Sequence, residues 1–206
     1  PNLIDGTYLA VSDVSNLGYS SARVTVENSF IVQVDLKEYD QNSVEKDFDL
    51  YEYEPSVNAN RELPWAFVAA QSPRVDMVTG ATYSSKQCIQ AVERAIEKAA
   101  LIKRAGKYFD GVFQAKSKID EHGYAIAVVT IKDDQMTNVE LKYIDADGRE
   151  RDFDTYEYEP SVIAYRELPK RFVTANSYDV DAITGATSSS IKYREAVKNA
   201  LEMARR

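Results

Sequence analysis

The 206-residue sequence has few of the side chains that metal sites and nucleophilic enzymes require. Its one cysteine, Cys88, excludes an internal disulfide and any metal site built from cysteines alone. Its one histidine, His122, excludes a histidine-rich metal site and a histidine-activated nucleophile that occurs twice. We therefore expect no catalytic residues and no metal ligands.

Long apolar runs and an excess of positive charge are also absent. No apolar run approaches the roughly 18 residues that a membrane-spanning helix needs. The net charge of −8 argues against a protein that binds the phosphate backbone of nucleic acids. Hydrophobic residues make up 44% and charged residues 28%, which is typical of a folded globular protein. We expect a soluble monomer that binds no nucleic acid.

The second half of the sequence repeats the first half at a spacing of 105 residues. Residues 1–101 align with residues 106–206 without a gap, and 46 of these 101 pairs are identical. Residues 51–57 and 156–162 match at every position. Six of the eight glycines and four of the six prolines also pair, which indicates that the two halves share their turns and their backbone path.

A repeat of this length corresponds to a whole small domain rather than to a solenoid unit. We expect two tandem copies of one domain, at residues 1–104 and 105–206, joined near Ala105 and Gly106. Alternating apolar residues predict an antiparallel meander of at least three strands in each copy. The predicted strands are residues 7–11, 19–26 and 30–37, and residues 112–115, 124–131 and 136–143. In the third strand the alternation predicts one apolar face made of Phe30, Val32, Val34 and Leu36.

Helices are predicted to follow the strands in each copy. Pro64 suits the first position of a short helix that includes residues 65–71, with a counterpart at residues 172–176. A longer amphipathic helix comes last, and Arg94 falls outside its apolar stripe. The stripe contains Cys88, Val92, Ala95, Ile96 and Ala99 in the first copy, and Ala196, Val197, Ala200, Leu201 and Ala204 in the second. This order predicts an α+β fold, in which an antiparallel sheet packs against C-terminal helices.

The segment before each long helix carries the most informative pattern. Residues 76–82 and 181–187 both read Asp-x-x-Thr-Gly-Ala-Thr. The first amides of a helix have no intrahelical partner and attract anions such as phosphate. A hydroxyl residue at this place is ordinarily a helix cap, worth about 1 kcal/mol. A cap requires only one such residue, however, whereas five of these seven positions are identical in both copies.

This motif resembles that of the FMN-binding domain, which occurs in the C subunit of Na⁺-translocating NADH:quinone oxidoreductase and in the G subunit of the Rnf complex. The whole chain is similar to the tandem FMN-binding, PplA-like lipoproteins of Gram-positive extracellular electron transfer. The resemblance implies that Thr82 and Thr187 are each joined to FMN through a phosphoester bond, which an ApbE-type flavin transferase forms from FAD with Mg²⁺. The other motif residues would form the recognition sequence: Asp76, Thr79, Gly80, Ala81, Asp181, Thr184, Gly185 and Ala186.

Four tyrosines are further candidates for contact with the flavin ring. Tyr51 and Tyr53, and their counterparts Tyr156 and Tyr158, share a face if their segments are extended. The alternative is that they are ordinary half-buried tyrosines of a strand or loop. Glu54 and Glu159 precede prolines and are candidates for fixing a loop.

The resemblance also implies an electron carrier rather than an enzyme. Its electrons would come from a membrane donor such as a quinone-linked dehydrogenase and pass to soluble flavin or ferric iron. The protein would lie at the extracellular face of the membrane, with a lipid anchor upstream of Pro1. Two alternatives stay open: an electron-feeding module of a larger flavin-dependent extracellular reductase, or a ligand-binding or adhesion module without flavin.

Overall fold

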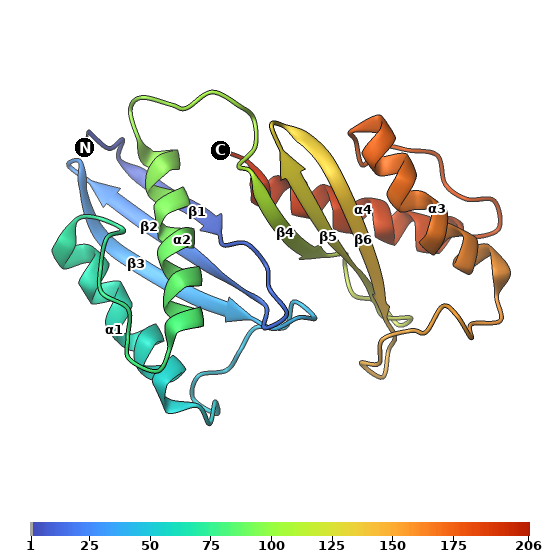
Figure 1. The fold of residues 1–206 in the computed structure, drawn as a ribbon, viewed down its shortest axis with the longest axis horizontal. Coiled ribbons are helices and arrows are strands. Elements are labelled where there is room, and N and C mark those ends of the chain that lie inside the picture. Colours follow the sequence, from blue (N-terminus) through green and yellow to red (C-terminus); the bar gives the residue numbers. More distant parts are fainter. Residues whose placement is uncertain (1) are drawn as a thin grey trace. The chain divides into compact units, whose positions relative to one another are not determined.

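The computed structural model describes residues 2–206, which form two compact units that divide between Ala105 and Gly106. Each unit contains three strands followed by two helices (Figure 1). The first unit contains β1 (Gly6–Val11), β2 (Tyr19–Glu27), β3 (Phe30–Tyr39), α1 (Glu54–Ala70) and α2 (Thr82–Ala99). The second contains β4 (Gly111–Lys116), β5 (Tyr124–Lys132), β6 (Gln135–Ile144), α3 (Glu159–Ala175) and α4 (Thr187–Ala204). The predicted α+β fold with two tandem copies is confirmed.

Each sheet is a three-stranded antiparallel meander, in the order β1-β2-β3 and β4-β5-β6. The predicted face of β3 is wrong in its first half, because Val26 pairs with Ile31 while Thr25 pairs with Gln33. This β-bulge adds one residue to β3 and turns Ile31 toward the core. Phe30 and Val32, which we expected on the apolar face with Val34, are exposed instead.

Both helices of a unit pack against one face of its sheet, as Figure 1 shows for the first unit. Helix α2 lies along β1 and β2, α1 lies along β3, and the two helices contact each other. The predicted stripes of α2 and α4 are buried apart from Ile96, which is half-buried. Within residues 2–206, no helix is both long enough and apolar enough to cross a membrane.

The first helix of each unit begins earlier than we predicted, at Glu54 instead of Pro64 and at Glu159 instead of residue 172. Helix α1 starts at Glu54, with Pro55 in its first turn and Pro64 in its interior. An interior proline removes one backbone hydrogen bond and costs roughly 3 kcal/mol. Full burial of Leu63 and Phe67 on either side of Pro64 offsets this cost. Glu54 therefore belongs to the first helical turn and not to a loop, and the same holds for Glu159 in α3.

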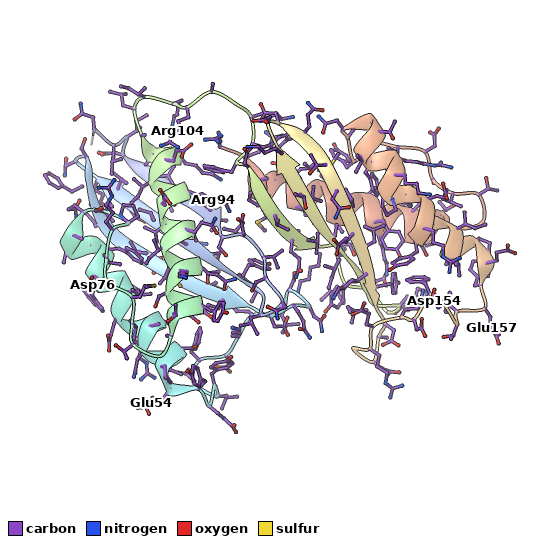
Figure 2. All side chains as sticks on the ribbon, in the orientation of Figure 1. Glu54, Asp76, Arg94, Arg104, Asp154 and Glu157 are labelled. Carbon is purple, nitrogen blue, oxygen red and sulfur yellow. The ribbon has the colours of Figure 1, made fainter. Side chains whose placement is uncertain are left out.

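Arg94 is also placed differently from our prediction, because it is buried although it lies outside the apolar stripe (labelled on α2 in Figure 2). Its guanidinium donates hydrogen bonds to the Val11 carbonyl at 2.9 Å and to the Asp13 carboxylate at 2.7 Å. These partners satisfy the buried charge, so Arg94 ties α2 to the end of β1.

Candidate functional site

A tight turn leads into the long helix of each unit. The Ala81 N–H donates to the Val78 carbonyl at 3.0 Å, and Gly80 between them has a φ of 81°. Gly185 has a φ of 80° at the same place in the second unit. This left-handed backbone region favours glycine, which explains why the motif carries glycine at this position.

A serine in the helix fixes this turn. The Val78 N–H donates to the Ser85 hydroxyl at 3.1 Å, and the Ile183 N–H donates to the Ser190 hydroxyl at 3.1 Å. Both serines are fully buried. The turn is therefore held against the first helical turn in the same way in both units.

The threonines Thr82 and Thr187 are the first residues of α2 and α4. The capping positions before them are Ala81 and Ala186, and no side chain caps either helix start. The capping explanation of the motif is therefore wrong. Both threonines are exposed, and their hydroxyls make no hydrogen bond with any residue from 2 to 206. Each hydroxyl is thus available beside helix amides that lack a partner.

The starts of both helices in a unit are joined to each other. The Tyr53 hydroxyl, at the start of α1, donates to the Gly80 carbonyl at 2.8 Å, and the Tyr158 hydroxyl donates to the Gly185 carbonyl at 2.7 Å. Deeper in the first unit, Ser56 and Ser84 share a hydrogen bond of 3.2 Å between their hydroxyls. Two positive helix ends therefore lie close together at the motif.

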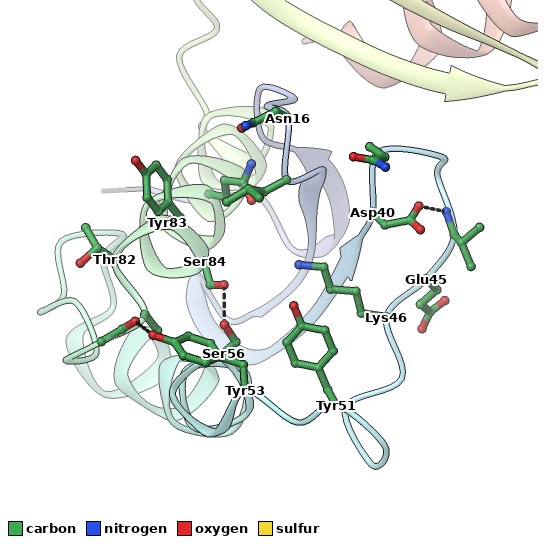
Figure 3. Close-up of a pocket in the computed structure, with 16 residues that line it drawn as sticks. Asn16, Asp40, Glu45, Lys46, Tyr51, Tyr53, Ser56, Thr82, Tyr83 and Ser84 are labelled. Carbon is green, nitrogen blue, oxygen red and sulfur yellow. Dashed lines mark hydrogen bonds between the residues drawn. The ribbon is translucent and has the colours of Figure 1, made fainter. Parts of the chain in front are cut away.

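A hollow of about 750 Å³ opens beside the motif in the first unit (Figure 3). Thr82 and Tyr83 lie on one side of it in this view, and Lys46 and Tyr51 lie on the other. The remaining lining includes Tyr53, Ser56, Gly80, Ala81, Ser84, Leu17, Asp40, Val44 and Glu45. Tyr51 and Tyr53 thus line one hollow together, as their spacing predicted.

The second unit has a hollow of about 720 Å³ lined by Tyr156 and Tyr158. Thr187 is not among the residues that line it, but Tyr158 connects it to the motif through Gly185. The other lining residues are mostly charged: Asp145, Arg149, Glu150, Arg151, Asp152 and Glu157, with Thr155.

A buried ion pair lies beside the first hollow and was not predicted from the sequence. The Lys46 ammonium is 3.1 Å from the Glu38 carboxylate, and the Ser84 hydroxyl donates to the same carboxylate oxygen at 3.2 Å. Since Ser84 donates to Glu38, Ser56 donates to Ser84. The other carboxylate oxygen of Glu38 is buried and has no hydrogen-bond partner within residues 2–206. This oxygen of Glu38 can therefore still accept a hydrogen bond beside the first hollow.

The second unit has a different arrangement at the same positions, 105 residues later. Tyr143 replaces Glu38, and Arg151 replaces Lys46. The Arg151 guanidinium lies 4.2 Å from the centre of the Tyr143 ring and 4.3 Å from that of Tyr156. It is held by cation–π contacts rather than by a carboxylate.

Cys88 is a structural residue, as its place in the helix predicted. It is fully buried, and burial raises the pKa of its thiol to about 12. A thiol with such a pKa is neither a nucleophile nor a metal ligand at neutral pH. Its counterpart Tyr193 is also fully buried.

The outer residues of the motif lie away from the hollows. Asp76 and Thr79 are exposed and do not line the first hollow, and Asp181 and Thr184 are exposed and do not line the second. Arg171 contacts this segment by donating to the Asp181 carbonyl at 3.4 Å. These four exposed motif residues are accessible to another protein.

The residues of the first hollow fit a flavin mononucleotide. Its volume lies within the range of about 300–1,000 Å³ that is usual for small-molecule sites. Tyr51, Tyr53 and Tyr83 supply aromatic surface for a flat ring. The free helix amides and the Lys46 ammonium supply donors for phosphate or ring oxygens.

Comparison with known proteins points to the same cofactor. The family model described as "FMN-binding domain" matches residues 18–97 and 122–202, one stretch in each unit. No curated protein matches the chain. The crystal structure of the CPE2226 protein from Clostridium perfringens is similar at 25% sequence identity, covers 47% of this chain and 88% of that one, and has a TM-score of 0.40. On the family match over most of its length, the chain belongs to the FMN-binding domain family and contains two tandem copies of that domain.

Proposed function

We propose that this protein is an electron carrier with two covalent FMN groups, one on Thr82 and one on Thr187. The family match supports a flavin carrier. The observation that carries the covalent linkage is the exposed threonine hydroxyl at an uncapped helix start, found twice on a turn held by identical contacts. FMN would supply the redox chemistry, while the chain positions the flavin and tunes its potential.

The attachment is proposed to be made by an ApbE-type flavin transferase that uses FAD and Mg²⁺. A bond forms between threonine Oγ and the flavin phosphate as AMP leaves. The phosphodiester that results keeps one negative charge, which the amides at the start of α2 or α4 are placed to bind. The exposed motif residues Asp76 and Thr79 are available for the transferase to read.

The direction of electron flow is also a proposal. The donor would be a membrane dehydrogenase linked to quinone, and the acceptors would be soluble flavin or ferric iron at the extracellular face of a lipid-anchored protein.

The intact mass after treatment with transferase, FAD and Mg²⁺ tests the attachment. We expect two additions of FMN minus water in the unaltered chain, one in Thr82→Ala, one in Thr187→Ala and none in the double variant. Thr7→Ala, an exposed threonine outside the motif, is the matched control and should keep both additions. An unmodified mass, or a protein that loses its yellow colour on acid precipitation, would contradict covalent attachment and favour a module without bound flavin.

A further inference from the structure

The two flavin sites share their backbone but differ in charge at one buried place. In the first unit, the Lys46 ammonium lies 3.1 Å from Glu38. The Lys46 side chain is 15% exposed and that of Glu38 only 1%, so water screens this pair little. The charge of Lys46, which lines the first hollow, is therefore neutralised by the carboxylate of Glu38, which does not line it.

In the second unit, the corresponding cation has no such partner. Arg151 lies against the rings of Tyr143 and Tyr156, and within residues 2–206 no carboxylate is within ion-pair distance of its guanidinium. The residue that would neutralise it, at the position of Glu38, is Tyr143. Four carboxylates also line the second hollow, those of Asp145, Glu150, Asp152 and Glu157, but none of them forms an ion pair with Arg151.

The carboxylates that line the hollows do not create this difference. Asp40 and Asp145 are equivalent, and each accepts backbone N–H groups of its own turn. Glu45 and Glu150 are equivalent as well. Asp152 and Glu157, which line only the second hollow, have the counterparts Asp47 and Glu52 in the first unit. Both units therefore carry acidic residues at the same four positions.

Other charge differences are paired or exposed. Lys192 replaces Gln87 but forms an ion pair with Asp120. Glu121 and His122 replace Asn16 and Leu17 of the first unit. The His122 imidazole lies 3.7 Å from the Glu121 carboxylate, and both side chains are largely exposed. Solvent screens such exposed groups.

One replacement in the lining adds a cation to the second hollow. Val44 of the first hollow corresponds to Arg149 in the second, and Asp147 adds an exposed carboxylate in the same turn, so these two exposed charges offset each other. An apolar surrounding disfavours the extra negative charge of a reduced flavin, and an unpaired cation favours it.

We propose that the two sites are redox-inequivalent, with the flavin on Thr187 at the higher potential, and that the pairing of Lys46 by Glu38 against the unpaired Arg151 sets the order. This inference rests on the proposed function. At equilibrium two electrons and their accompanying proton leave the reduced flavin of the first unit, which becomes oxidised, and reduce the flavin of the second. The equilibrium constant is expected to be tenfold or more, which for a two-electron couple is a gap of about 30 mV or more.

Spectroscopic redox titration of single-flavin proteins tests this order. Thr187→Ala leaves the first flavin alone, and Thr82→Ala leaves the second alone. We expect the midpoint potential of the second flavin to be higher by at least the tenfold gap. Equal potentials, or the reverse order, would overturn the inference.

Variants of the two determinants test the cause. In the first site, Glu38→Gln should raise the potential while Glu38→Asp, which keeps the charge, should leave it nearly unchanged. In the second site, Arg151→Gln should lower the potential while Arg151→Lys should preserve it. Arg23→Gln, which removes an exposed cation that lines neither hollow, is the surface control and should shift neither potential. If the neutral variants shift the potential no more than their charge-keeping partners, the assignment to these residues is wrong.

The outcomes separate this inference from the function on which it rests. Intact mass shows whether each protein carries FMN before it is titrated. Missing FMN contradicts both proposals, whereas attached FMN with equal potentials contradicts only the inequivalence.

Discussion

Replacing Lys46 with methionine removes one partner of the buried ion pair beside the first hollow. Glu38 would keep only the Ser84 hydroxyl as a partner, although its side chain is 1% exposed. Removing one member of a buried pair leaves an uncompensated charge and costs about 3–5 kcal/mol. We therefore expect Lys46→Met to lower the free energy of unfolding of the first unit by roughly this amount.

A matched control is the residue next to Glu38 on β3. Lys37 pairs with Glu45 at 2.9 Å, but the two side chains are 53% and 49% exposed. Exposed pairs contribute about 0–1 kcal/mol, so Lys37→Met should have little effect. Comparing the two lysines separates loss of a buried pair from loss of a lysine in general.

Cys88 provides an assay specific to the first unit, because it is the sole cysteine and is fully buried there. Its modification by a thiol reagent in urea reports unfolding around α2. With a urea dependence of about 1–3 kcal/mol per molar, Lys46→Met should lower the midpoint by about 1 M or more. Combining it with Glu38→Gln should restore much of the loss, since no buried charge is left unpaired. Equal midpoints for the Lys46 and Lys37 variants would refute the reasoning.

Three further changes have defined outcomes. Gly80→Ala places a Cβ 3.2 Å from Pro55 at a φ of 81°, and should lower the free energy of unfolding by about 1–2 kcal/mol from the backbone alone, plus a penalty for the contact. Gly148→Ala, at a φ of 79° with no atom within 4 Å, is the control and should lower it less in urea unfolding followed by circular dichroism. An equal loss in both variants would exclude a contribution from the Pro55 contact. Tyr53→Phe removes the bond to the motif turn, so we expect a loss of about 1 kcal/mol and slower FMN attachment in a time course by intact mass, which an unchanged rate would contradict. Burial raises the pKa of Cys88 from 9.0 to about 12, so the unfolded chain releases this proton first and stability should fall as pH rises from about 9 to 12; Cys88→Ala should show a shallower decline, and an identical one would assign the effect to other groups.

Much of the fold was predictable because the signals are local. The six strands and the long helices follow from alternation, turn residues and apolar stripes, which depend on neighbouring residues only. The bulge at Val32 was not predictable, because an extra residue in one strand is defined by its pairing with the other strand. The early start of α1 was missed because Pro64 is unfavourable inside a helix unless tertiary burial, here of Leu63 and Phe67, outweighs the lost hydrogen bond.

The site was predictable to the extent that both copies share it. Thr82, Gly80 and the turn serine Ser85 are repeated, so comparison of the copies could find them. Glu38 and Lys46 could not be found in this way, because the positions hold Tyr143 and Arg151 in the second copy. Their proximity arises only when β3 and the loop after it fold together.

Peptide mapping by mass spectrometry tests the central claim most directly. Trypsin should release residues 75–86 and 172–192 from transferase-treated protein, each with one motif threonine that we propose to be modified. We predict that fragmentation places FMN on Thr82 in the first peptide and on Thr187 in the second. FMN on another residue, or both peptides at their unmodified mass, would contradict the account.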